Sequence, residues 1–142
     1  MKQKRVSIKG ILLGFLIDVG VSIGGTIVIA IVLMIQNGIP ENPESIMTPC
    51  TYGLSLVVAF LGTTLGGFVT GKIAKKSEVF NASLMGLLSV LTAIPFMNGP
   101  LLYDVAGYGL TIPFAILGGY LAIKKNTSNQ RTHSITASGG SE

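Results

Sequence analysis

The sequence predicts an all-α integral membrane protein, a four-helix bundle with both termini in the cytoplasm. Composition is the first reason, because 49% of the 142 residues are hydrophobic and only 11% are charged, too few for an ordinary soluble domain. The second reason is that the apolar residues fall into runs close to the roughly 20 residues that cross a bilayer. The third is the placement of the ten Lys and Arg residues, which all fall on one side of the resulting topology.

The first predicted span covers about residues 11–35. Basic residues precede it, as they do in a secretory signal peptide, but the apolar run of about 25 residues is longer than the apolar core of such a peptide. No small-residue cleavage site follows it, so we expect a retained span. Residues 36–49 contain three prolines, Glu41 and Glu44 but no lysine or arginine, a composition that predicts an exposed loop.

The remaining three spans are predicted at about 51–73, 79–97 and 104–123. Lysines at positions 72, 75 and 76 end the second span, and Asn98-Gly99-Pro100 predicts a tight turn after the third. Lys124 and Lys125 end the fourth. Residues 1–125 are therefore expected to form one transmembrane domain, and the polar residues 126–142 a disordered cytoplasmic tail.

Charge gives the expected orientation of these spans. Four spans place the N-terminus, the 74–78 connection and the C-terminus on one side of the membrane. The loops on the other side carry Glu41, Glu44 and Asp104 and no basic residue. Because cytoplasmic loops are enriched in lysine and arginine, we expect a multi-pass membrane protein with its N- and C-termini in the cytoplasm.

Small residues recur on one face of each predicted span. In the second span they follow a spacing of four, which keeps them on the same side of a helix. Helices in lipid associate through close backbone contact at such residues, so these stripes predict the packing faces of the bundle. The alternative is that the same residues form a glycine-lined path for water or solute. The predicted packing residues are Gly14, Ala59, Thr63, Gly66, Gly67, Gly71, Gly86, Gly118 and Gly119.

One segment resembles a known pattern. The stretch from Gly66 to Lys76, GGFVTGKIAKK, is followed by NASLMGLL at 81–88. Together they resemble a GGFxxGxIAxK motif found in uncharacterised small bacterial membrane proteins with about four spans. The resemblance implies the same topology and a bacterial inner-membrane (cytoplasmic membrane) location, and it carries no activity.

The sequence offers no set of residues for enzymatic chemistry. Gly66 to Lys72 fits the spacing of a phosphate-binding loop, but Ile73 replaces the required Ser or Thr and no strand precedes it. The single Cys50 and single His133 supply neither a disulfide nor a nucleophile and base pair. We therefore expect no enzyme activity, no cofactor, no metal and no nucleic-acid partner.

Asp18 is the one charged residue predicted at membrane depth. It could join helices through hydrogen bonds to Ser22, Thr63 or Thr64, or it could couple protons or cations, with Ser22 beside it. The sequence favours a non-enzymatic assembly or accessory component packed through its small-residue faces. Its partners would be the lipid bilayer and either further copies of the chain or another membrane protein. The alternative is a minimal proton- or cation-coupled small-solute transporter that uses Asp18.

Overall fold

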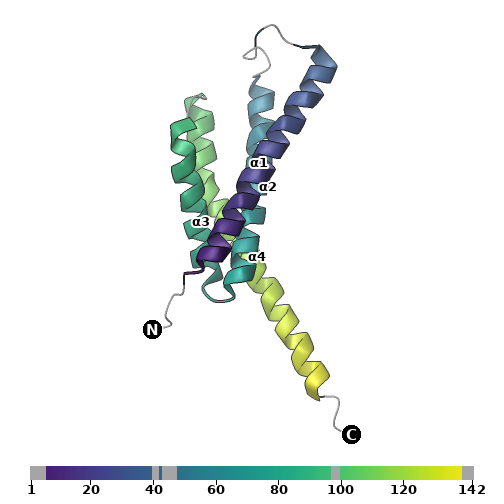
Figure 1. Ribbon diagram of the computed structural model, residues 1–142, viewed down its shortest axis with the longest axis vertical. Helices are drawn as coiled ribbons and strands as arrows, with labels where there is room; N and C mark the ends of the chain where they lie inside the picture. The colour runs from purple at the N-terminus through teal and green to yellow at the C-terminus, as the bar shows by residue number, and fades with distance from the viewer. Residues whose placement is uncertain (1–5, 40–41, 43–47, 97–99, 139–142) are drawn as a thin grey trace.

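The computed structural model describes residues 6–39, 42, 48–96 and 100–138. This part of the chain forms α1 (Ile8–Asn37), α2 (Pro49–Ala74), α3 (Glu78–Ala93) and α4 (Leu101–Ser138), with a short 3-10 helix, η2 (Ile94–Phe96), after α3 (Figure 1). Three helices are long and apolar enough to cross a membrane: α1, α2 and the Leu101–Thr127 part of α4. The all-α prediction is confirmed for the described residues, and three of the four predicted spans coincide with helices of membrane-spanning length and apolar composition.

Capping residues set the ends of α1 and α2. Ser7 precedes α1, and its hydroxyl accepts a hydrogen bond from the backbone N–H of Gly10. Thr48 does the same for Thr51 at the start of α2, where Pro49 occupies a position that needs no N–H donor. These caps start each helix two or three residues earlier than predicted. α2 ends where Lys75 adopts a left-handed conformation with φ 49° and donates its N–H to the Gly71 carbonyl.

α3 is shorter than the predicted span at 79–97. It ends at Ala93 after 16 residues, and the chain continues as η2. Pro95 explains the change, because proline lacks the N–H donor that the next hydrogen bond of the α-helix would need. The predicted turn at Asn98 and Gly99 lies outside the described residues.

α4 is longer than the predicted span at 104–123. It begins at Leu101 and continues past Lys124 and Lys125 to Ser138, so residues 126–138 are helical where the sequence predicted a disordered tail. No glycine or proline occurs between Asn126 and Ser138. An established helix gains one backbone hydrogen bond for each residue it adds, so nothing in this segment ends it.

The helices form two pairs that diverge toward one end of the molecule. Figure 1 shows α1 lying along α2, and α3 along the first half of α4, with the pairs close together at the lower end and apart at the upper end. The lower end is tightly packed because small residues face each other there. Gly67 on α2 lies against the backbone of Ala115 on α4, and Gly86 on α3 lies against the Ala115 side chain.

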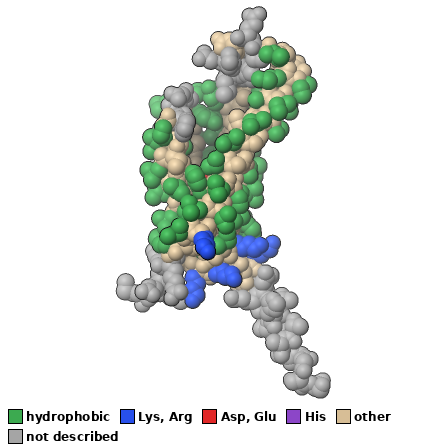
Figure 2. Space-filling model, viewed as in Figure 1, with side chains coloured by type: hydrophobic (Ala, Val, Ile, Leu, Met, Phe, Trp, Pro, Cys, Tyr) green, Lys and Arg blue, Asp and Glu red, His purple; other side chains and the backbone are tan. Residues whose placement is uncertain are grey.

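The surface separates apolar and basic regions. Figure 2 shows hydrophobic side chains over the length of the helices, with the lysines gathered at the narrow end. Many of the exposed side chains are large and apolar, such as Leu16 at 63% and Leu61 at 58% exposure. A water-soluble protein rarely exposes so continuous an apolar surface, whereas lipid tails cover it favourably. We call this end the lysine end. Its described lysines are Lys9 in the first turn of α1, Lys72, Lys75 and Lys76 at and after the end of α2, and Lys124 and Lys125 on α4.

Candidate functional site

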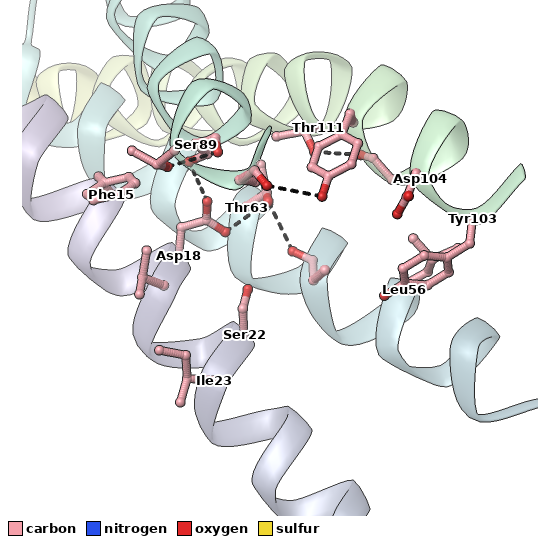
Figure 3. Close-up of a pocket in the computed structure, with 16 residues that line it drawn as sticks. Phe15, Asp18, Ser22, Ile23, Leu56, Thr63, Ser89, Tyr103, Asp104 and Thr111 are labelled. Carbon is pink, nitrogen blue, oxygen red and sulfur yellow. Dashed lines mark hydrogen bonds between the residues drawn. The ribbon is translucent and has the colours of Figure 1, made fainter. Parts of the chain in front are cut away.

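A cavity of about 530 Å³ lies between the diverging helix pairs, and all four α-helices contribute to its lining. Its size falls within the range of small-molecule binding pockets. The walls are mostly apolar, with Phe15 and Val19 on α1 and Leu56 on α2. Two carboxyl groups, those of Asp18 and Asp104, interrupt this apolar lining (Figure 3).

Asp18 on α1 is held by hydroxyl groups from two other helices. Its Oδ1 accepts a hydrogen bond of 2.9 Å from Thr63 Oγ1 on α2, and its Oδ2 accepts one of 2.6 Å from Ser89 Oγ on α3 (Figure 3). The Asp18 residue is only 5% exposed. A buried carboxyl group is costly unless its oxygens are hydrogen-bonded, and here one side chain from each neighbouring helix supplies a donor. Asp18 therefore joins α1, α2 and α3 at the cavity.

Both hydroxyl groups have a second acceptor within reach. Thr63 Oγ1 lies 3.0 Å from the Ala59 carbonyl oxygen, and Ser89 Oγ lies 3.5 Å from Met85 Sδ. A hydroxyl has a single hydrogen but can accept as well as donate. When Asp18 is ionised, both hydroxyls can donate to it. When Asp18 is protonated it can donate to one hydroxyl, whose own hydrogen turns to the second acceptor. The site thus supplies hydrogen-bond partners in both protonation states.

The sequence identified only some of these contacts. Thr63 forms the hydrogen bond expected of it, but Thr64 donates to the Phe60 carbonyl within α2 instead. Ser22 lines the cavity one turn from Asp18, and no hydrogen bond between these two side chains occurs in the described structure. Ser89 was not among the partners expected for Asp18. Its approach to Asp18 depends on how α3 crosses α1, which helical spacing within one span does not reveal.

The predicted packing glycines lie at contacts between helices. Gly14 faces Gly66, and Gly118 lies against the backbone of Thr64 and Gly67. Ala59 and Thr63 differ from the glycines, because they line the cavity instead of joining backbones. The glycine contacts close the lysine end of the bundle and leave the cavity in the other half. The remaining pairs are Gly71 with Gly119 and Ala122, Gly86 with Ala115, and Gly119 with Ala82.

Asp104 is a second buried carboxyl group, which the sequence placed in an outer loop. It lies in the first turn of α4 and is 8% exposed. No described residue donates a hydrogen bond to its carboxylate, which lines the cavity beside Tyr103 and Tyr108. The spacing of residues 104, 107, 108 and 111 on one helical face could have indicated a polar lining on α4.

The charged side chains of the lining, and the possible metal-binding side chains of the described residues, indicate which ions the cavity can bind. Its lining contains two aspartates and no lysine or arginine, so its potential favours cations. The described residues contain no group of three His, Cys, Asp or Glu side chains that could hold a metal ion. Cys50 is exposed at the start of α2, away from Asp18.

Comparison of the chain with models of protein families, with curated proteins and with solved structures finds no match.

Proposed function

We propose that the chain crosses a bacterial inner membrane four times, with both termini in the cytoplasm. The lysines at one end of the helices support this orientation, since basic residues favour the cytoplasmic side. The length of the third segment supports four crossings. Its 16 α-helical residues extend about 24 Å and the three residues of η2 about 6 Å more, together close to the thickness of the hydrocarbon core, about 30 Å.

Within that topology, we propose that the protein is a proton-coupled transporter of a small solute, with Asp18 as the coupling group. The observation that carries this proposal is the placement of Asp18 at a cavity, between two hydroxyl groups that each have a second acceptor. A purely structural aspartate would need partners in one protonation state only. An ionisable residue at membrane depth is a common feature of proton pathways.

The contacts suggest how proton binding is linked to the cavity. Loss of the Asp18 proton adds a negative charge to the lining and draws the hydrogens of Thr63 and Ser89 toward the carboxylate. Those two hydroxyls belong to different helices, so their rotation changes the contacts between α1, α2 and α3 at one place. A solute whose binding depends on the charge of Asp18 is thereby coupled to the proton.

A flux measurement tests this function. Protein in proteoliposomes is exposed to a pH gradient with amines, quaternary ammonium ions, amino acids and organic anions in turn, while an enclosed pH indicator reports proton movement. We expect one class of solute to drive proton flux in the wild type and not in Asp18→Asn, because an amide cannot take up and release a proton. Glu78→Gln, which removes a carboxylate at the lysine end, is the matched control and should retain flux. Equal flux in wild type and Asp18→Asn would contradict the proposal.

A second candidate function, assembly with other membrane proteins, has a specific observation in its favour. Gly20 and Gly24 lie four residues apart on α1, and a Cβ added to either would meet no atom within 4 Å. Small residues at this spacing form helix dimer contacts in membranes. Most of the other glycine faces are already covered by the chain's own helices, which is why we rank assembly second. Disulfide crosslinking of Leu16→Cys and Ile27→Cys, two exposed positions on the same face as Gly20 and Gly24, tests it in a Cys50→Ala background. Pairing above the level of random collision would support assembly.

A further inference from the structure

We propose that Asp104, Tyr103 and Tyr108 form a binding site for an organic ammonium ion in the cavity. This inference deepens the proposed function and rests on it for the meaning of the site, because the ammonium ion would be the solute whose movement is coupled to the Asp18 proton.

The Asp104 carboxylate lines the cavity and has little exposure to solvent. Only 8% of the residue's surface is exposed, and no described residue donates a hydrogen bond to its side chain. The carboxylate oxygens are not sealed from solvent, because Asn126 Nδ2 is the one fully buried side-chain polar atom without a partner among the described residues. A cation in the cavity would supply the partner that polar groups of such low exposure normally have.

Two tyrosine rings lie next to this carboxylate in the cavity lining. Tyr103 and Tyr108 both line the cavity, and the Tyr103 ring packs on Tyr52 with centroids 4.9 Å apart. Tyr108 is held by a hydrogen bond from its hydroxyl to the Ala93 carbonyl. The electron-rich faces of tyrosine rings attract ammonium groups, above all quaternary ones. Fixed rings beside a carboxylate therefore suit an ammonium group.

The size of the cavity and its apolar walls favour an organic cation over an inorganic ion. A cavity of about 530 Å³ is much larger than an inorganic ion, and the walls opposite Asp104 present Phe15, Val19 and Ile23 instead of oxygen ligands. Hard metal cations take six or more oxygen ligands, which two separated carboxylates do not offer. An ammonium ion with apolar substituents uses both the charge and the apolar walls. Figure 3 shows Asp18 and Asp104 well apart in the lining, on α1 and α4, so a single organic cation at Asp104 leaves Asp18 to its hydroxyl partners.

Equilibrium dialysis of protein in lipid nanodiscs tests this site, with benzyltrimethylammonium as the probe. We expect saturable binding of one probe per chain, above the level in empty nanodiscs. Neopentylbenzene has the same shape without the charge, and it should show only unsaturable partitioning. Asp104→Asn keeps the size of the side chain and should weaken binding about tenfold, the loss that corresponds to one charge-assisted contact. Asp104→Glu should restore most of it, and Tyr103→Leu should weaken binding severalfold.

Glu78→Gln serves as the control, because it removes one negative charge at the other end of the molecule and should leave binding unchanged. Thermal unfolding of each variant shows that it is folded. Binding to folded Asp104→Asn as tight as to the wild type, or no saturable binding to the wild type, would overturn the inference. Proton flux is measured separately: binding without flux would contradict the proposed coupling and leave the ammonium site intact. Flux without ammonium binding would contradict the ammonium site and leave the proposed coupling intact.

Discussion

The backbones of Gly14 on α1 and Gly66 on α2 pack directly against each other. A Cβ on either residue would meet the carbonyl oxygen of the other, so neither position has room for a side chain. One helical turn farther from the lysine end, Asp18 on α1 meets Thr63 on α2. The glycine contact therefore sets the distance between the two helices at which the Asp18 carboxyl group reaches its first hydroxyl partner.

Alanine substitutions on α1 should have opposite effects at two glycines. Gly14→Ala should lower the free energy of unfolding by about 1–3 kcal/mol, because its methyl group would displace the α2 backbone. Gly20→Ala should raise it by up to about 1 kcal/mol, because Gly20 has open space around it and alanine favours helix more than glycine. Unfolding of both variants in mixed micelles provides the measurement. Equal stability of the two variants would disprove the assigned contact.

The sequence predicted those features of the bundle that depend on residues close together in the chain. Apolar run length located the helices, and small residues four apart located the α2 face that carries Gly66, Gly67 and Gly71. Local rules also explain why α3 ends before Pro95, although the predicted span extended past it. The Ser89 bond to Asp18 joins residues 71 positions apart and depends on how two helices cross. No spacing within either helix contains that information.

Asp104 shows a second reason for incomplete prediction. A charged residue at the start of an apolar run is expected to lie at the membrane surface, and this rule placed Asp104 in a loop. α4 begins at Leu101 instead, and the packing of all four helices around the cavity buries the carboxylate. Burial that arises from packing between segments is visible only in three dimensions.

Substitutions of Asp18 should separate its contribution to stability from its charge. Asp18→Asn keeps an acceptor and gains a donor, so it should change the free energy of unfolding by less than about 1 kcal/mol. Asp18→Leu removes both hydrogen bonds between helices. Thr63 and Ser89 can turn to their second acceptors, so we expect a moderate loss of about 1–3 kcal/mol. Thermal unfolding in detergent distinguishes the two variants, and a larger loss for Asn than for Leu would refute the assigned hydrogen bonds.

Asn81 should be one of the most sensitive positions of the lysine end. Its side chain is fully buried, accepts a 2.7 Å hydrogen bond from the Ser7 backbone N–H and donates to the Ser77 carbonyl at 2.9 Å. Asn81→Leu removes these bonds and leaves a backbone donor of the chain entering α1 without its partner, which should cost about 1–3 kcal/mol. Ser83→Ala removes only a local bond to the Phe80 carbonyl and provides a control. Similar melting temperatures for the two variants would count against this role.

Labelling of single cysteines in intact cells tests the proposed orientation. The native Cys50 is exposed at the start of α2, at the opposite end from the lysines. If both termini are cytoplasmic, a membrane-impermeant maleimide added outside should label Cys50 in the wild type. In a Cys50→Ala background, Asn42→Cys and Pro100→Cys should also react from outside, whereas Lys76→Cys and Ser128→Cys should react only after the membrane is permeabilised. The basic residues of the lysine end carry this expectation, since moving them across the membrane is disfavoured. Labelling of Lys76→Cys from outside would show that the orientation is the reverse of the one proposed. The cavity would then lie in the cytoplasmic half of the membrane.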